Sequence, residues 1–157
     1  MFGWGKKRKQ QDDLGPEVKQ IFEKIRRLFD SEAFQNSLLP EPMRAVVLKG
    51  LNCDKIPGGQ GDFGRDPTNP IPVNGPLGQI LYLSQLQTAR SNSPIMFHRV
   101  SSTSVGNAEV DMYEVLSIDE TVREYLYLSF YHPRRSRLCP TGYRIERTVD
   151  FGNPIYA

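Results

Sequence analysis

A proline- and glycine-rich segment at residues 52–76 divides this sequence into two halves with different hydrophobic periodicity. The segment holds five prolines and five glycines. Proline removes a backbone donor that helix interiors and central strands need, so neither a long helix nor a central strand fits here. We therefore expect a long loop, and loops of this length inside a compact domain are uncommon and often functional. The folded body has to be built from the elements on either side.

Before the loop, two stretches show the periodicity of helices. From Pro16, apolar residues recur every three or four positions along one stripe, and Pro42 to Gly50 repeats a proline-first, glycine-last pattern. Residues 31–39 between them can form a short helix of their own. We expect two N-terminal helices within residues 16–51 that pack their apolar sides on a sheet. The stripe of the first helix consists of Val18, Ile21, Phe22, Ile25, Leu28 and Phe29.

After the loop, four stretches read as strands because they are rich in β-branched and aromatic residues and are separated by short polar breaks. Such breaks favour hairpins, so we expect a four-stranded antiparallel meander with a fifth, short edge strand near residues 143–149. In the last stretch Leu126, Leu128 and Phe130 share one face, while tyrosines occupy the other. One sheet face should be apolar and covered, the other tyrosine-rich and partly open. The four stretches are residues 77–88, 94–102, 108–118 and 121–132.

Length and composition place the chain among single-domain α+β proteins. Its 157 residues suit one domain, which we assign to residues 15–150, between a flexible basic and aromatic tail at 1–14 and a C-terminal tail at 151–157. No stretch is apolar enough to span a bilayer and the start of the chain lacks the apolar core of a secretory signal, so a cytoplasmic location is expected. The runs at residues 66–86 and 131–143 suggest a bacterial protein, which implies nothing about activity.

Charge and cysteine usage exclude several function classes. A formal net charge of +2 argues against a dedicated nucleic-acid binder, although nucleic acid stays a less favoured partner. Cys53 and Cys139 are too few for a disulfide framework or a zinc cluster. The glycine-rich part of the loop lacks the lysine of a phosphate-binding P-loop, and the aspartates there fit no EF-hand spacing. We expect no metal and no cofactor.

The segment that most suggests a binding site follows the fourth predicted strand. Three arginines stand within four residues, and Pro133 and Pro140 restrict the backbone around them. Two interpretations are open: the arginines pair with the six acidic residues between 108 and 124, or they bind an anionic ligand or an acidic partner. On the second interpretation, replacing Arg134 and Arg135 with alanine should weaken binding and barely change stability. The predicted binding residues are Tyr131, His132, Arg134, Arg135 and Arg137.

These observations lead to two functional hypotheses of different classes. The first is a non-enzymatic binding or adaptor protein that contacts a protein partner or an anionic ligand through the arginine-rich loop at the end of the sheet. The alternative is a small hydrolase or ribonuclease-like enzyme in which Glu114 acts as base, His132 as acid and Arg134 as a phosphate clamp. The alternative requires these three side chains to converge on one concave site.

The N-terminal tail carries a separate signal. Phe2 and Trp4 precede four consecutive basic residues, Lys6 to Lys9. Aromatic and basic residues together suit docking on an anionic membrane surface, on nucleic acid or on a partner protein. The other interpretation is a flexible, solubilising tail.

Overall fold

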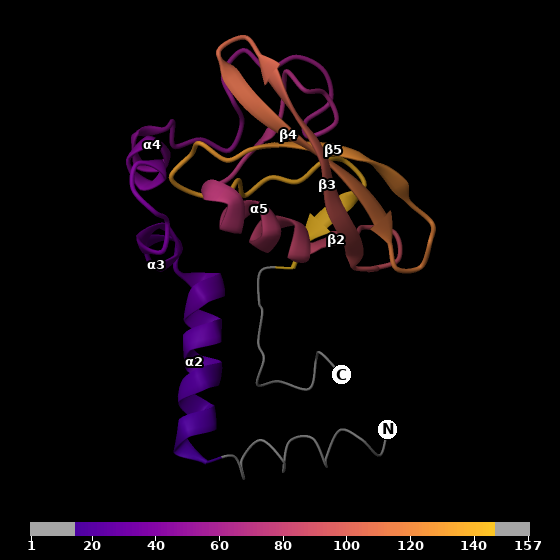
Figure 1. Ribbon diagram of the computed structural model, residues 1–157. Coiled ribbons are helices and arrows are strands. Elements are labelled where there is room, and N and C mark those ends of the chain that lie inside the picture. Colours follow the sequence, from indigo (N-terminus) through magenta and orange to yellow (C-terminus); the bar gives the residue numbers. More distant parts are fainter. Residues whose placement is uncertain (1–14, 147–157) are drawn as a thin grey trace.

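The computed structural model describes residues 15–146, which form an α+β fold (Figure 1). The predicted tails at 1–14 and 151–157, with Phe2, Trp4 and the basic run, lie outside the described residues. Four helices and six strands are described: α2 (Pro16–Asp30), α3 (Glu32–Ser37), α4 (Met43–Lys49), β1 (Ile71–Pro72), α5 (Gly75–Ser84), β2 (Leu86–Thr88), β3 (Ile95–Val105), β4 (Ala108–Ser117), β5 (Arg123–Ser129) and β6 (Tyr143–Ile145).

The main sheet is mixed, with strand order β1-β5-β4-β3. Strands β3, β4 and β5 form the predicted antiparallel hairpins. However, β1 pairs in parallel with β5, and β6 leaves the main sheet to pair antiparallel with β2. The prediction of a plain antiparallel meander of four to five strands is therefore wrong for the edges of the sheet, although it is confirmed at its centre.

The largest correction concerns residues 77–88, which we expected to be the first strand. Most of this stretch is helix α5, and only its end forms the short strand β2. Gly75, at a backbone φ of +73°, and Pro76 occupy the first turn, where proline suits a helix. The consecutive residues Leu81, Tyr82 and Leu83 are all buried. A helix that is covered on most sides loses the one-sided stripe by which helices are recognised in a sequence.

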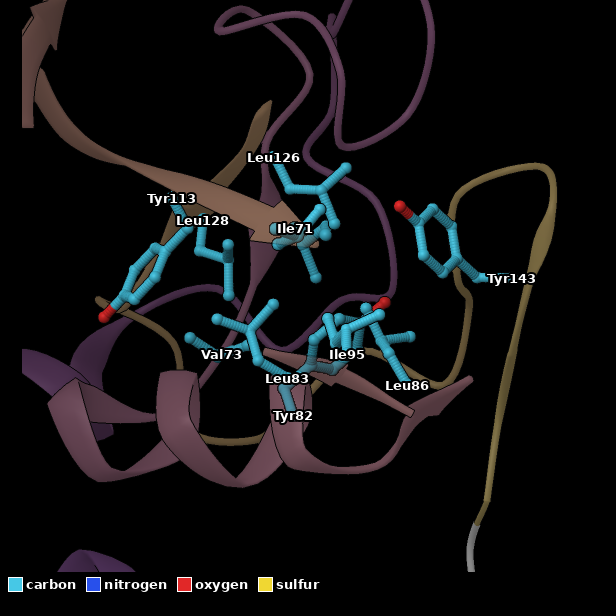
Figure 2. Packing of buried hydrophobic residues seen from close by; sticks show 11 residues of the cluster. Ile71, Val73, Tyr82, Leu83, Leu86, Ile95, Tyr113, Leu126, Leu128 and Tyr143 are labelled. Carbon is cyan, nitrogen blue, oxygen red and sulfur yellow. The ribbon is translucent and has the colours of Figure 1, made fainter. Parts of the chain in front are cut away.

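Helix α5 is the helix that covers the apolar face of the sheet. Figure 2 shows Leu83 and Val73 between α5 and the strand that carries Leu126 and Leu128. The last two residues are fully buried, which confirms the face predicted for them. The buried cluster consists of Ile71, Val73, Tyr82, Leu83, Leu86, Ile95, Tyr113, Val115, Leu126, Leu128 and Tyr143.

Helix α2 forms where the periodicity predicted it, but it does not pack on the sheet. None of its residues is buried, and Ile21 is 55% exposed. In Figure 1 the helix projects away from the sheet, with α3 and α4 beyond its C-terminal end. The expectation that the N-terminal helices cover the sheet is wrong because α5 already occupies that face. Within residues 15–146 we find no helix of sufficient length and hydrophobicity to cross a bilayer.

The predicted loop at 52–76 contains the two-residue strand β1 and the start of α5, and its part before β1 is fixed onto β5 by an ion pair. Arg65 donates from Nε to Glu124 Oε1 at 2.6 Å and from Nη2 to Oε2 at 3.1 Å, and the Tyr143 hydroxyl donates to the same carboxylate at 2.7 Å. Burial alone would raise the pKa of Glu124, but the bonds from Arg65 and Tyr143 outweigh it and hold that pKa below its usual value. This carboxylate has a structural role.

Candidate functional site

The arginine-rich loop comprises residues 130–142, between β5 and β6. It is held against residues 50–54 and against helix α3. Asn36 donates from Nδ2 to the Pro133 carbonyl at 2.8 Å, and Ser136 donates to the Asp54 carbonyl at 2.7 Å. Gly50 lies so close to the loop that a Cβ atom there would overlap the Tyr131 carbonyl oxygen. Side chains on this loop are therefore presented from a fixed backbone.

Arg134 is engaged inside the protein. Its Nε donates to Asn52 Oδ1 at 2.6 Å and its Nη1 to Asp54 Oδ1 at 2.7 Å, and its side chain is only 17% exposed. The bond from Arg134, and then the bond from the Arg137 backbone N–H, hold the pKa of the Asp54 carboxyl below its usual value. Arg134 thus ties the loop to the 52–54 segment.

Arg135 is engaged still more deeply. Its Nη2 donates to the Phe29 carbonyl at 2.7 Å, its Nη1 donates to Gln85 Oε1 at 3.0 Å, and Glu32 Oε1 lies 3.9 Å from Nε. The acidic partners of Arg134 and Arg135 thus come from residues 54 and 32. The interpretation that these arginines pair with the acidic residues between 108 and 124 is wrong for both of them.

Arg137 differs from its two neighbours because its guanidinium is spare. Its backbone N–H donates to Asp54 Oδ1 at 2.9 Å, and the residue is exposed. Among residues 15–146 no side-chain hydrogen bond or ion pair is formed by Arg137. It remains available to a group from outside.

A pocket of about 220 Å³ opens beside Arg137. It lies where the end of α2, the end of α5 and strand β6 meet the arginine-rich loop. Arg135 and Arg137 bring positive charge to its wall, and Asp30 and Glu32 bring negative charge. The lining residues are Phe29, Asp30, Glu32, Tyr82, Gln85, Arg135, Ser136, Arg137 and Ile145.

The two other residues predicted for the site, Tyr131 and His132, do not line this pocket. The Tyr131 hydroxyl donates to Glu109 Oε2 at 3.3 Å. His132 is buried, with Nδ1 2.7 Å from the Leu51 carbonyl and Nε2 3.2 Å from Ser129 Oγ. Because a carbonyl can only accept, Nδ1 carries a proton, and the neutral ring accepts from Ser129 through Nε2. Burial lowers the pKa of His132 although its bond to Leu51 opposes this.

The lowered pKa of His132 predicts a loss of stability in mild acid. Its folded pKa lies below the unfolded value of about 6.5, so the unfolded state takes up the proton first. The stabilising contribution is fully present above that value and falls as the pH drops below it. We expect urea unfolding of the wild type to show a fall in stability between about pH 7 and pH 5.

The matched variant for this prediction is His132→Asn, which keeps a donor but cannot titrate. It should be less stable than the wild type at neutral pH, and its stability should change less over the same interval. Parallel pH profiles for the two proteins would show that His132 does not carry the effect.

The structure does not bring together the three residues of the enzyme hypothesis. Glu114 belongs to the open face of the sheet, where it pairs with Tyr125 on β5. His132 is bonded to Ser129, four residues further along that strand, which is a separation of about 13 Å. Arg134 is held by Asn52 and Asp54. No carboxylate is among the hydrogen-bond partners of His132 in the described chain.

Glu114 instead joins a cluster that sequence reasoning missed. Its Oε1 lies 3.1 Å from His98 Nε2, and its Oε2 accepts from Arg123 Nη2 at 3.3 Å. These bonds, first from His98 and then from Arg123, hold the pKa of Glu114 below its usual value. A register counted back from the β3–β4 turn would pair Glu114 with Arg99. A bulge at Val100 shifts the pairing to His98.

The cluster lies on the predicted tyrosine-rich face, which is partly open as expected. Tyr125 and Met96 are each about half exposed there. The His98 and Arg123 side chains are both largely exposed. An exposed cluster of this kind lacks the water exclusion that strengthens acid–base chemistry.

No group of three or more potential protein ligands for a metal occurs within the described part of the chain. Two aspartates of the long loop have other roles. Asp54 accepts from Arg134, and Asp66 accepts from the Thr68 backbone N–H at 2.9 Å and from its hydroxyl at 2.7 Å. The second arrangement is a local turn bond of the kind that aspartate commonly forms.

The structure thus divides the predicted site residues among different roles. Of the five predicted site residues, Arg135 and Arg137 line the pocket, Arg134 fixes the loop, and Tyr131 and His132 lie elsewhere. Gln85 and Tyr82 belong to the pocket and were missed because their segment was assigned to a strand. Comparison with known proteins finds no matching family model, no significantly similar curated protein and no significantly similar solved structure.

Proposed function

We propose that this protein is a non-enzymatic binding protein that takes an acidic segment of a partner protein into the pocket beside Arg137. The observation that carries the proposal is the spare guanidinium of Arg137 at a pocket of about 220 Å³. Arginine binds carboxylates through two parallel hydrogen bonds, and such charge-assisted bonds are about twice as strong as neutral ones.

The rest of the loop supports this role by reducing the entropy lost on binding. The side chains of Arg134 and Arg135 form internal contacts, and these contacts fix the backbone from which Arg137 projects. A guanidinium presented from a fixed loop needs less ordering when a ligand arrives. The binding function thus rests on one exposed arginine and two structural ones.

The acidic residues of the pocket narrow the ligand class. Asp30 and Glu32 lie in the same wall as Arg135 and Arg137, so a bare anion would meet repulsion as well as attraction. A peptide offers a side-chain carboxylate to Arg137 together with backbone N–H donors for Asp30, since Glu32 already pairs with Arg135. This composition favours an acidic peptide segment over a free inorganic anion.

The test is isothermal titration calorimetry, in which an N-acetylated oligoglutamate peptide is titrated into the protein. An oligoglutamine peptide of the same length serves as the reference. We expect oligoglutamate alone to bind, and Arg137→Gln to weaken binding about tenfold because it removes a charge-assisted contact. The stability of Arg137→Gln should stay within about 0.5 kcal/mol of the wild type, as for other surface substitutions.

The matched control is Arg90→Gln, which removes one exposed arginine from the turn between β2 and β3. It should bind like the wild type. Equal weakening by Arg90→Gln and Arg137→Gln would show that only overall charge attracts the peptide. Absence of oligoglutamate binding to the wild type would overturn the proposed ligand class.

The hydrolase alternative draws no support from the placement of Glu114, His132 and Arg134, and we do not adopt it. A cytoplasmic location, a bacterial origin and a protein partner with an acidic segment remain predictions.

A further inference from the structure

Helix α2 carries an apolar stripe whose first two residues are exposed, while the remaining four are half-buried. Val18 is 36% exposed and Ile21 is 55% exposed, and no residue of the helix is buried. Figure 1 shows the helix projecting from the body of the molecule. A stripe of this kind costs solubility unless something covers it, and unusually large exposed apolar surface commonly marks an interaction site.

The width of the stripe fits a broad surface better than a second helix. With 3.6 residues per turn, its six residues span about 120° of the helix circumference. A coiled-coil seam uses a narrower stripe of two positions per heptad, flanked by complementary charges. Here the position after Ile21 is Phe22, an aromatic residue in the place where a paired helix would carry a charge.

The charges beside the stripe favour an anionic surface. On a helical projection Lys19 and Arg26 border one edge, and Lys24 borders the other beside Glu17. Arg26 is engaged, since it contacts Glu23 at 3.3 Å, so the proposal depends on Lys19 at that edge and on Lys24 at the other. Long basic side chains at both edges can extend to lipid phosphates while the stripe enters the acyl boundary.

The sequence before α2 adds to this charge. Four consecutive basic residues, Lys6 to Lys9, precede the helix in the sequence. Basic residues next to an amphipathic helix attract anionic headgroups and add to the binding that apolar contact provides. Because one weak contact rarely holds a protein on a membrane, the pairing of an apolar stripe with a basic run is informative.

We propose that α2 docks the protein on an anionic lipid surface, lying in the plane of the interface with Val18 and Ile21 inserted between headgroups. The helix has 15 residues, which at 1.5 Å per residue is about 22 Å. It therefore lies on the membrane and does not cross it. This docking is independent of the peptide pocket at Arg137.

The test is co-sedimentation of the full chain with vesicles of phosphatidylcholine mixed with phosphatidylglycerol, and with vesicles of phosphatidylcholine alone. We expect binding to the mixed vesicles and much weaker binding to the neutral ones. Ile21→Gln should weaken partition into the mixed vesicles about tenfold or more, since it removes one inserted side chain without changing charge.

Two control variants keep the test specific. Ile118→Gln makes the same change at an isoleucine with 58% exposure in the β4–β5 turn, and it should bind like the wild type. Gln20→Glu adds a negative charge on the polar side of α2 and should weaken binding far less than Ile21→Gln. Circular dichroism should show the same helix content in all variants.

Three results would overturn the proposal. The first is that the wild type fails to bind the mixed vesicles. The second is that Ile21→Gln binds like the wild type, which would leave the basic residues as the sole attraction. The third is that the wild type is a dimer in solution, Ile21→Gln is a monomer, and neither binds vesicles, which would assign the stripe to a second copy of this chain.

Discussion

Replacing Arg135 with alanine should lower the free energy of unfolding by about 3 kcal/mol, in the range found when one partner of a buried charged network is removed. The side chain is 12% exposed and joins three separate elements, through the Phe29 carbonyl, Gln85 and Glu32. Truncation leaves Gln85 Oε1 without this donor, removes the charge that pairs with Glu32, and leaves the Phe29 carbonyl with the bond from Gln35 Nε2 at 3.1 Å. Urea unfolding followed by circular dichroism measures the loss.

The matched control for this prediction is Arg137→Ala, two residues further along the same loop. It removes the same charge where no internal partner is lost, so its stability should stay close to that of the wild type. Equal stability of the two variants would contradict the structural role of Arg135. The binding interpretation of the sequence predicted the reverse, namely little effect of Arg135→Ala on stability.

Replacing Gly50 with alanine should destabilise the protein by about 3 kcal/mol, near the upper end for overpacked sites. The new Cβ would overlap the Tyr131 carbonyl oxygen and lie 2.8 Å from the carbonyl carbon. Both obstacles are backbone atoms, which cannot rotate away. The substitution must therefore separate residues 50–54 from the arginine-rich loop and break the bond from His132 to Leu51.

The control for Gly50 is Gly15→Ala at the start of α2. Gly15 has a negative φ, and nothing lies within 4 Å of its Cβ position. Its replacement should change stability by less than about 1 kcal/mol. If Gly50→Ala unfolds at the same urea concentration as Gly15→Ala, the close contact between the two segments is not tight in solution. Loss of peptide binding by Gly50→Ala with Arg137 intact would support the need for a fixed loop.

The two elements that were predicted best are those whose pattern is one-sided. The alternation around Leu126 and Leu128 located β5 and its buried face, and the stripe from Val18 to Phe29 located α2. In each case the residues alternate between environments, and the period reveals the backbone geometry. The stripe of α2 did not reveal that Val18 and Ile21 would stay exposed.

Helix α5 shows why a period can fail. Its residues from Leu81 to Leu83 are buried without a break, so the sequence shows a continuous apolar run of the sort that a covered strand also gives. The proline in its first turn was a valid signal for a helix start. That signal was assigned instead to the end of the preceding loop.

The arginine-rich loop shows a second kind of limit. Its sequence marked it as a constrained loop with three arginines, and that description is confirmed. Which arginine is spare depends on partners about 80 and 106 positions away, Asp54 for Arg134 and Phe29 for Arg135. Hydrogen bonds form between groups that the fold places within about 3 Å, and sequence spacing carries no record of that distance.

The amino-acid sequence by itself determined the α+β class, the central hairpins, the amphipathic helix from Pro16 and the position of the arginine-rich loop. These follow from local periodicity and from the restricted backbones of proline and glycine, which act over a few residues. Only the tertiary structure decided that α5 covers the sheet, that the first turns of α2 stay exposed and that Arg137 alone among the three arginines has no side-chain partner in the described chain. Those outcomes depend on competition for one apolar face and on contacts between segments far apart in the chain.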